Sequence, residues 1–265
     1  MPHVGASSRL GRLAAYALAG MAGEVRDPYQ QSAEFIDLMI RDAWGQIGPA
    51  VTQGLGSADP ARGPVVDVGA GSGIGTRLIA EALPGVEIVA LEPSVAMRAV
   101  LLARVADSPE LRRRVTVLAD PVQTARLPER CSAVVALHML GHLPPEDRRG
   151  LWRLLASRIE GGGLGLVNLL PPLEPVVVPD TVMADVAVGR RRYQGWARAE
   201  PAGADQVVWH MTYRTLSDGE VVDERQASYR WWVLSEERLA GELAVHGLAA
   251  QRIGPAEAGL WLIRG

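Results

Sequence analysis

The fold is decided by one stretch of sequence, Val65-Val66-Asp67-Val68-Gly69-Ala70-Gly71-Ser72-Gly73-Ile74-Gly75-Thr76. Its first four residues are apolar except for Asp67, which is typical of a buried strand, and a glycine-rich turn and the start of a helix follow. Glycines in the turn allow positive φ and a close approach to the backbone, while the helix N-terminus presents unpaired N–H groups. The stretch therefore predicts a site at which a small polar or anionic ligand docks.

Two other glycine-turn chemistries do not fit this spacing. A nicotinamide-dinucleotide fingerprint that starts at Gly69 requires its third glycine at position 74, where this chain has isoleucine. A phosphate-binding loop requires a lysine, and all 27 basic residues of this chain are arginines. The same lack of lysine excludes Schiff-base chemistry.

The composition is that of a globular protein with only a weak net charge. The chain has 265 residues, of which 48% are hydrophobic and 22% are charged, and its net charge is −3. A mildly acidic chain lacks the basic surface of a dedicated nucleic-acid-binding protein, so no nucleic-acid partner is expected. Since no apolar run is long enough for a membrane span and Cys131 is the single cysteine, we expect no membrane partner and a cytoplasmic location.

Short apolar runs alternate with longer periodic segments between Pro64 and Leu170. The apolar runs predict strands at residues 65–68, 86–91, 115–118, 133–137 and 164–169. The periodic segments predict helices at residues 76–83, 94–105 and 146–159. Continuous apolar strands separated by helices indicate a parallel sheet with helices on both faces. The predicted fold class is therefore α/β, with a doubly wound, Rossmann-like sheet.

The other segments predict additions to this sheet. Apolar residues at near-helical spacing predict an N-terminal helical cover. After the fifth strand, two strands at residues 206–215 and 221–232, joined by Ser217-Asp218-Gly219-Glu220, predict a small antiparallel lid. A last helix and an antiparallel hairpin complete a seven-stranded sheet. The predicted boundaries are 1–55 for the cover, 56–170 for the core, 171–234 for the lid and 235–265 for the last elements of the core.

The stretch from Asp67 to Gly73 resembles motif I of class I S-adenosylmethionine (SAM)-dependent methyltransferases. Glu92, which ends the second predicted strand 23 residues after Gly69, is similar to the family's acidic residue that binds both ribose hydroxyls. Asp120, just after the third strand, resembles the carboxylate that receives the adenine amino group. The resemblance is to the small-molecule, bacterial natural-product branch, and it implies SAM as cofactor and S-adenosylhomocysteine as product.

Leu137-His138-Met139-Leu140-Gly141-His142-Leu143-Pro144 follows the fourth predicted strand and resembles the loop beneath the transferred methyl group in small-molecule members. His138 and His142 are thereby the candidates for catalysis. The family often has two adjacent histidines where this chain has Gly141-His142, which leaves the histidine mechanism open. No metal site is expected, because no histidine pair has a helical ligand spacing together with a carboxylate.

The resemblance also implies which residues bind the cofactor. Tyr29 resembles an N-terminal tyrosine that related enzymes fold over SAM, with core packing as the alternative. The implied cofactor-binding residues are Tyr29, Asp67, Gly69, Ala70, Gly71, Glu92, Pro93, Met97, Asp120, Pro121, Leu137 and His138.

Aromatic residues concentrate in and beside the predicted lid. Tryptophan and tyrosine combine an apolar face with a polar group and suit pockets for planar or cationic ligands. One face of the first lid strand is too apolar for open solvent, and it carries Val207, Trp209, Met211 and Tyr213. We expect the acceptor to bind Tyr29, Trp196, Trp209, Tyr213, Tyr229 and Trp231.

The reaction implied by the resemblance is in-line methyl transfer from SAM to a nitrogen, carbon or oxygen of a small acceptor. An aromatic or heteroaromatic acceptor in bacterial secondary metabolism fits the aromatic lid best. Two alternatives stay open, namely a methyltransferase acting on a peptide, a protein or RNA, and a SAM-binding protein without turnover. The sequence does not choose the acceptor atom or the oligomeric state.

Overall fold

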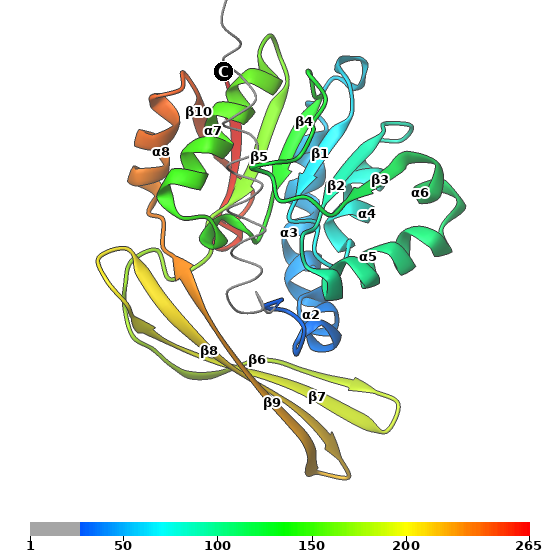
Figure 1. Cartoon of the computed structure of the whole chain (residues 1–265), viewed down its shortest axis with the longest axis vertical. Coiled ribbons are helices and arrows are strands. Elements are labelled where there is room, and N and C mark those ends of the chain that lie inside the picture. The colour runs from blue at the N-terminus through cyan, green and yellow to red at the C-terminus, as the bar shows by residue number, and fades with distance from the viewer. Residues whose placement is uncertain (1–26) are drawn as a thin grey trace, which may run out of the picture.

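The computed structural model describes residues 27–265, which form a seven-stranded sheet flanked by helices and a separate four-stranded sheet (Figure 1). The large sheet has the order β10-β11-β5-β4-β1-β2-β3, in which all neighbours are parallel except the pairs made by β11. Its strands are β1 (Val65–Val68), β2 (Ile88–Leu91), β3 (Val115–Leu118), β4 (Ala133–Ala136), β5 (Leu164–Asn168), β10 (Ala249–Ile253) and β11 (Leu260–Arg264). The predicted doubly wound α/β sheet with an antiparallel last hairpin is confirmed.

Helices cover both faces of this sheet because successive strand residues are apolar on both sides. Val65 of β1 belongs to one apolar cluster and Val66 and Val68 belong to the other. The first cluster receives side chains from α3 (Arg41–Leu55), α4 (Ile74–Ala82), α5 (Val95–Asp107) and α6 (Pro109–Arg114). The second receives them from α7 (Pro145–Ile159) and α8 (Glu236–Ala244).

The four-stranded sheet, which we call the lid, is an antiparallel meander. Its strands are β6 (Val178–Val188), β7 (Arg191–Pro201), β8 (Gln206–Ser217) and β9 (Glu220–Trp232). Asp218 and Gly219 have φ of 53° and 88°, as the predicted tight turn between β8 and β9 requires.

The prediction of only two lid strands was wrong, because β6 and β7 give weak hydrophobic signals. Most residues of β6 are exposed, as befits the edge of a sheet. On β7, the buried positions are the small residues Gly195, Ala197 and Ala199, where a large apolar side chain would have indicated a strand.

The short helix α2 (Ala33–Met39) lies between the large sheet and the lid (Figure 1). The Phe35 ring lies 5.2 Å from the Tyr213 ring of β8, measured between centroids. A Cβ on Gly195 of β7 would lie 2.5 Å from Met39 Sδ, so the helix packs directly on the lid backbone. The lid is therefore supported by the N-terminal cover.

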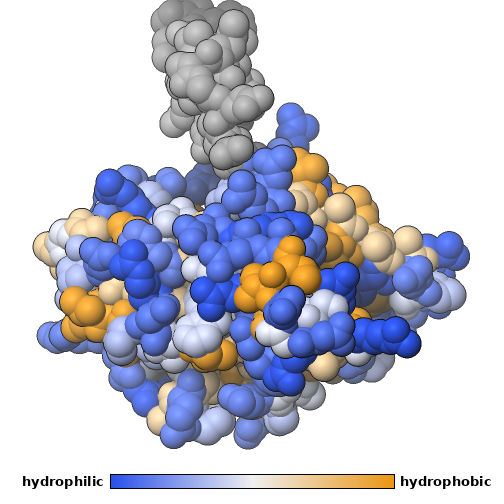
Figure 2. All heavy atoms as spheres, turned by 90° about the horizontal axis from the view of Figure 1, so that it is seen from below, coloured by the Kyte–Doolittle hydropathy of each residue, from blue (hydrophilic) through white to orange (hydrophobic). Residues whose placement is uncertain are grey.

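The surface seen from the side of the lid is mostly hydrophilic, with separate hydrophobic patches (Figure 2). Among residues 27–265, no helix combines the length and the apolar character that crossing a membrane requires.

Candidate active site

The glycine turn after β1 has three glycines in the left-handed region. Gly69, Gly71 and Gly73 have φ of 71°, 58° and 83°. Added Cβ atoms would lie 3.0 Å from Met139 Cβ at Gly69 and 2.5 Å from Leu101 Cδ1 at Gly73, so packing requires glycine at both positions. At Gly71 the nearest atom would be Met97 Cε at 3.7 Å. A Cβ at Gly71 would make only ordinary van der Waals contact, so the positive φ and not the packing favours glycine there.

Glu92 connects this turn to the loop after β2. Its Oε2 accepts a hydrogen bond from the Gly71 backbone N–H at 2.7 Å, and its Oε1 accepts one from the Ser94 N–H at 2.7 Å. The side chain is buried, and burial raises the pKa of its carboxyl against the effect of these two hydrogen bonds. A carboxylate has about four acceptor positions. The two that remain suit the two hydroxyls of a ribose-type diol.

Asp67 lies buried within β1. Its Oδ2 accepts a hydrogen bond of 2.6 Å from the Thr76 hydroxyl, which joins the strand to the first turn of α4. Burial raises the pKa of Asp67 to about 6. The expected role of Asp67 in cofactor binding stays a prediction.

The other expected cofactor residues lie at the same edge of the sheet. The register pairs Val68 with Leu91 and Leu91 with Leu118, so the segments that follow β1, β2 and β3 begin side by side. Ala70, Met97 and Leu137 are buried there, while Pro93 and Asp120 are exposed and Pro121 is half-buried. The adenine role of Asp120 stays a prediction.

Asp27, which the sequence did not single out, fastens the N-terminal segment to this edge. Its Oδ2 accepts hydrogen bonds from Ser94 Oγ at 2.9 Å and from the Ala96 N–H at 3.0 Å. Burial raises the pKa of Asp27, but hydrogen bonds from Ala96, Tyr29 and Ser94 bring it below its ordinary value. Because Ser94 also donates to Glu92, the segment carrying Tyr29 is held beside the Glu92 carboxylate.

The Tyr29 hydroxyl lies 2.7 Å from His142 Nε2. Burial raises the pKa of Tyr29 well above its usual value. Desolvation by the groups packed around the His142 ring lowers its pKa to about 4, although part of the residue is exposed to solvent. Both groups are therefore neutral near neutral pH and share one hydrogen bond. The His142 ring also contacts the Trp231 and Tyr229 rings, with centroids 4.9 Å and 5.9 Å away. Residues from the cover, the core and the lid meet at this point.

His138 follows β4 with a φ of 59°, unusual for a residue with a side chain. Its N–H donates to Asn168 Oδ1 at 2.7 Å, and its ring stacks on Trp44 of α3 at 5.1 Å between centroids. Burial lowers its pKa to about 4, and its Nε2 is buried without a partner among the described residues. Asn168 and Trp44 were not predicted, although an asparagine at the carboxyl end of an apolar strand was a signal.

Trp231 fills the position that Gly141 leaves empty. Gly141 lies in the 3₁₀ helix η2 (Leu140–His142), and a Cβ there would overlap the Trp231 ring. No side chain fits at position 141 unless Trp231 moves. The departure from two adjacent histidines therefore makes room for a lid residue beside His142.

The lid turns one aromatic face toward this loop. Register pairs Val207 with Trp231 and Trp209 with Tyr229, and Tyr213 lies further along the same face of β8. Trp196 does not join them, because it pairs with Thr212 and lies on the opposite face, where the Arg214 guanidinium lies 5.6 Å from its ring centroid. Of the six residues expected to bind the acceptor, the structure brings Tyr29, Trp209, Tyr213, Tyr229 and Trp231 to the inner side of the lid.

Comparison with known proteins supports the reading of the motif. Residues 65–163 match a family model described as a methyltransferase domain, and no curated protein matches the chain by sequence. SAM-bound CalS10 from Micromonospora echinaspora, an amino pentose methyltransferase, is similar with 18% identity and a TM-score of 0.70 over 89% of this chain and 97% of its own. DesVI from Streptomyces venezuelae shares 18% identity, with a TM-score of 0.69 over 89% of this chain and 98% of its own.

The sugar N-methyltransferase KedS8 from Streptoalloteichus sp. is similar with 17% identity and a TM-score of 0.66, over 84% of this chain and 89% of its own. At these identities the likeness shows a shared fold. The family match identifies residues 65–163 as a methyltransferase domain, and the glycine turn and the sheet order agree with the resemblance to class I, SAM-dependent methyltransferases.

Proposed function

We propose that this enzyme methylates the amine nitrogen of a small acceptor, held between the loop of His142 and the aromatic face of the lid. The observation that carries the proposal is the neutral pair of Tyr29 and His142, 2.7 Å apart and surrounded by Tyr229 and Trp231. This pair sits at the carboxyl end of β4, the edge at which open α/β sheets bind ligands.

The residues at the glycine turn fit SAM. The glycine turn at Gly71 would accept the cofactor, and the two unused acceptor positions of Glu92 would receive its ribose hydroxyls. When bound, SAM supplies a methyl group on a sulfonium, which is already a good leaving group. The protein's own task is then to align the acceptor, to exclude water and to orient its lone pair.

The weak basicity of the histidines favours an amine over a hydroxyl. A hydroxyl acceptor needs a base to take its proton, and the pKa of His142 and of His138 is only about 4. A neutral amine attacks without prior loss of a proton, and its N–H can donate to the Tyr29 oxygen. The charge that develops on nitrogen is stabilised by the surrounding aromatic faces.

The names of the similar structures agree with this choice. CalS10 is named as an amino pentose methyltransferase of calicheamicin biosynthesis, and KedS8 as a sugar N-methyltransferase. We therefore expect an amino sugar, or another amine of natural-product metabolism, as the acceptor. The purely aromatic acceptor that the sequence favoured becomes the second candidate.

Two matched acceptor pairs test the proposal. An aminodeoxysugar is compared with the same sugar bearing a hydroxyl, and an aromatic amine with the corresponding phenol, each with SAM and the full chain. Release of S-adenosylhomocysteine and a mass increase of one methyl group on the amine alone are expected. Methylation of the hydroxyl compounds, or of a ring carbon, would contradict the proposed acceptor atom.

A further inference from the structure

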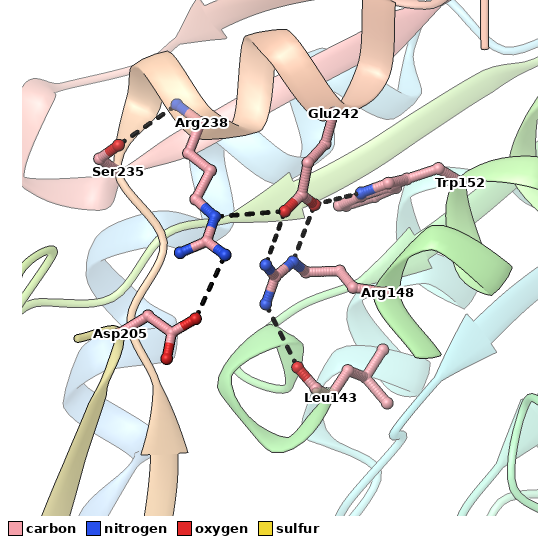
Figure 3. Close-up of polar contacts among 7 residues, drawn as sticks. All are labelled: Leu143, Arg148, Trp152, Asp205, Ser235, Arg238 and Glu242. Carbon is pink, nitrogen blue, oxygen red and sulfur yellow. Dashed lines mark hydrogen bonds and ion pairs between the residues drawn. The ribbon is translucent and has the colours of Figure 1, made fainter. Parts of the chain in front are cut away.

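A completely buried arginine lies close to the candidate transfer site without belonging to it. Arg148, in the first half of α7, is 0% exposed, and its Nε and Nη2 donate to the Glu242 carboxylate of α8 at 2.9 Å and 2.6 Å (Figure 3). Taking an ion pair out of water costs about as much free energy as the pair returns, so such a pair is weak evidence of a stabilising role. Stability alone therefore does not explain why Arg148 is buried at this position.

The arginine also holds the loop of His142. Arg148 Nη1 donates to the backbone carbonyl of Leu143 at 3.3 Å, and Leu143 directly follows His142. The contact spans the turn between η2 and the start of α7. It fixes the direction in which the chain leaves His142.

Glu242 connects Arg148 to the start of β8 in the lid. It accepts a hydrogen bond from Trp152 Nε1 at 2.8 Å and lies 3.6 Å from Arg238 Nε, while Arg238 Nη2 donates to Asp205 Oδ2 at 3.2 Å (Figure 3). Asp205 immediately precedes β8, and its carbonyl accepts the N–H of Val233, two residues after Trp231. The contacts that start at Arg148 thus reach, through Asp205, the residue that follows β9, the strand that carries Trp231.

We propose that Arg148 is a positioning residue for methyl transfer, which keeps His142 of the core and Trp231 of the lid in one fixed arrangement. Arg148 acts on His142 through the Leu143 carbonyl, and on Trp231 through Glu242, Arg238 and Asp205. The inference rests on the proposed function, because it assumes that the acceptor binds between these two rings.

Another arginine provides a matched control. Arg114 of α6 is also largely buried and donates to the carbonyls of Val86, Ala80 and Leu83, which lie on the α4 side of the sheet. Arg148→Lys and Arg114→Lys both keep the positive charge and lose the planar, multiply donating guanidinium. Both are expected to lower the melting temperature. Only Arg148→Lys is expected to disturb the transfer site.

Three measurements on both variants test the proposal. Isothermal titration gives the SAM affinity, NMR gives the titration of the His142 ring, assigned by its loss in His142→Gln, and steady-state kinetics give kcat for the amine that the wild type methylates. For Arg148→Lys we expect kcat to fall about 10-fold and the His142 pKa to rise from about 4 toward 6.5, with SAM affinity within about twofold. The NMR result needs no acceptor, so it tests whether Arg148 positions His142 separately from the test of the proposed function.

Normal kcat and an unshifted His142 titration in Arg148→Lys would overturn the proposal, as would an equal loss in Arg114→Lys. Should Arg148→Lys not fold, the half-buried Asp205 offers a milder variant. Asp205→Ala is compared with Asp185→Ala, which removes a lid carboxylate bound to Arg192 and Gln194. A kcat about threefold lower in Asp205→Ala alone supports the proposal, and equal values in the two variants refute it.

Discussion

The proposed cofactor side and the proposed acceptor side of this enzyme are built in different ways. On the cofactor side, Gly71, Glu92 and Ser94 lie within one short stretch of chain and are joined by hydrogen bonds from backbone N–H groups. On the acceptor side, Tyr29 and His142 are 113 residues apart and meet a lid residue, Trp231. Local backbone geometry determines the first site, whereas tertiary packing of aromatic rings determines the second.

The largest expected effect tests whether the glycine turn is the cradle of the cofactor. Gly71→Val places a branched side chain at a φ of 58° and in the space assigned to SAM, so SAM affinity should fall at least 100-fold by isothermal titration. Gly85→Val is the matched control, because Gly85 has a φ of 83° and no atom within 4 Å of an added Cβ. Normal SAM binding by Gly71→Val would mean that the cofactor lies elsewhere.

The next largest effect is expected from Glu92, the proposed partner of the ribose hydroxyls of SAM. Glu92→Gln keeps the shape of the side chain and removes its charge and one acceptor, so SAM affinity should fall by about 10- to 100-fold, or roughly 1.5–3 kcal/mol. Glu81→Gln, an exposed change on α4, should leave the affinity unchanged. Equal affinities of the two variants would show that Glu92 only ties the turn to α5.

The sequence predicts the locally encoded cofactor side better than the acceptor side, which depends on tertiary packing. The strand, the turn and Glu92 could be placed because motif I requires particular residues at particular spacings. The contact of Tyr29 with His142 could not, because nothing in either segment encodes its distance from the other. Because side chains alternate between the two faces of a strand, Trp209 could be correctly grouped with Tyr213. The face on which Trp196 lies could not be predicted, since β7 was not recognised as a strand.

A third prediction separates the two faces of the lid. Trp209→Ala removes part of the inner aromatic wall and should lower kcat/KM for the acceptor about 10-fold, with little change in SAM affinity. Trp196→Ala removes a tryptophan from the opposite face and should change kcat/KM by less than about twofold. If the two variants lose activity equally, the inner face is not the acceptor wall.

The smallest expected effect is that of acidification on the free energy of unfolding. His142, on the acceptor side, and Asp67, on the cofactor side, contribute to it with opposite signs. The folded pKa of His142 is about 4, below its unfolded value of 6.5, so between about pH 7 and pH 5 only the unfolded chain gains this proton and stability falls. The folded pKa of Asp67 is about 6, above its unfolded value of 3.8, so over the same range the folded chain gains this proton and stability rises.

Thermal melts at the two pH values measure both contributions. Relative to wild type, the drop in melting temperature on acidification should be smaller in His142→Gln and larger in Asp67→Asn. Identical drops in all three proteins would show that neither group titrates differently on folding.

The most direct test of the cofactor site is a calorimetric titration of SAM into the wild-type chain, repeated with NADH. One SAM site per chain and no binding of NADH are expected, because the turn at Gly71 and the Glu92 carboxylate suit the adenosyl ligand, while Ile74 stands where the dinucleotide fingerprint requires glycine. Binding of NADH in place of SAM, or no binding of SAM, would contradict this expectation.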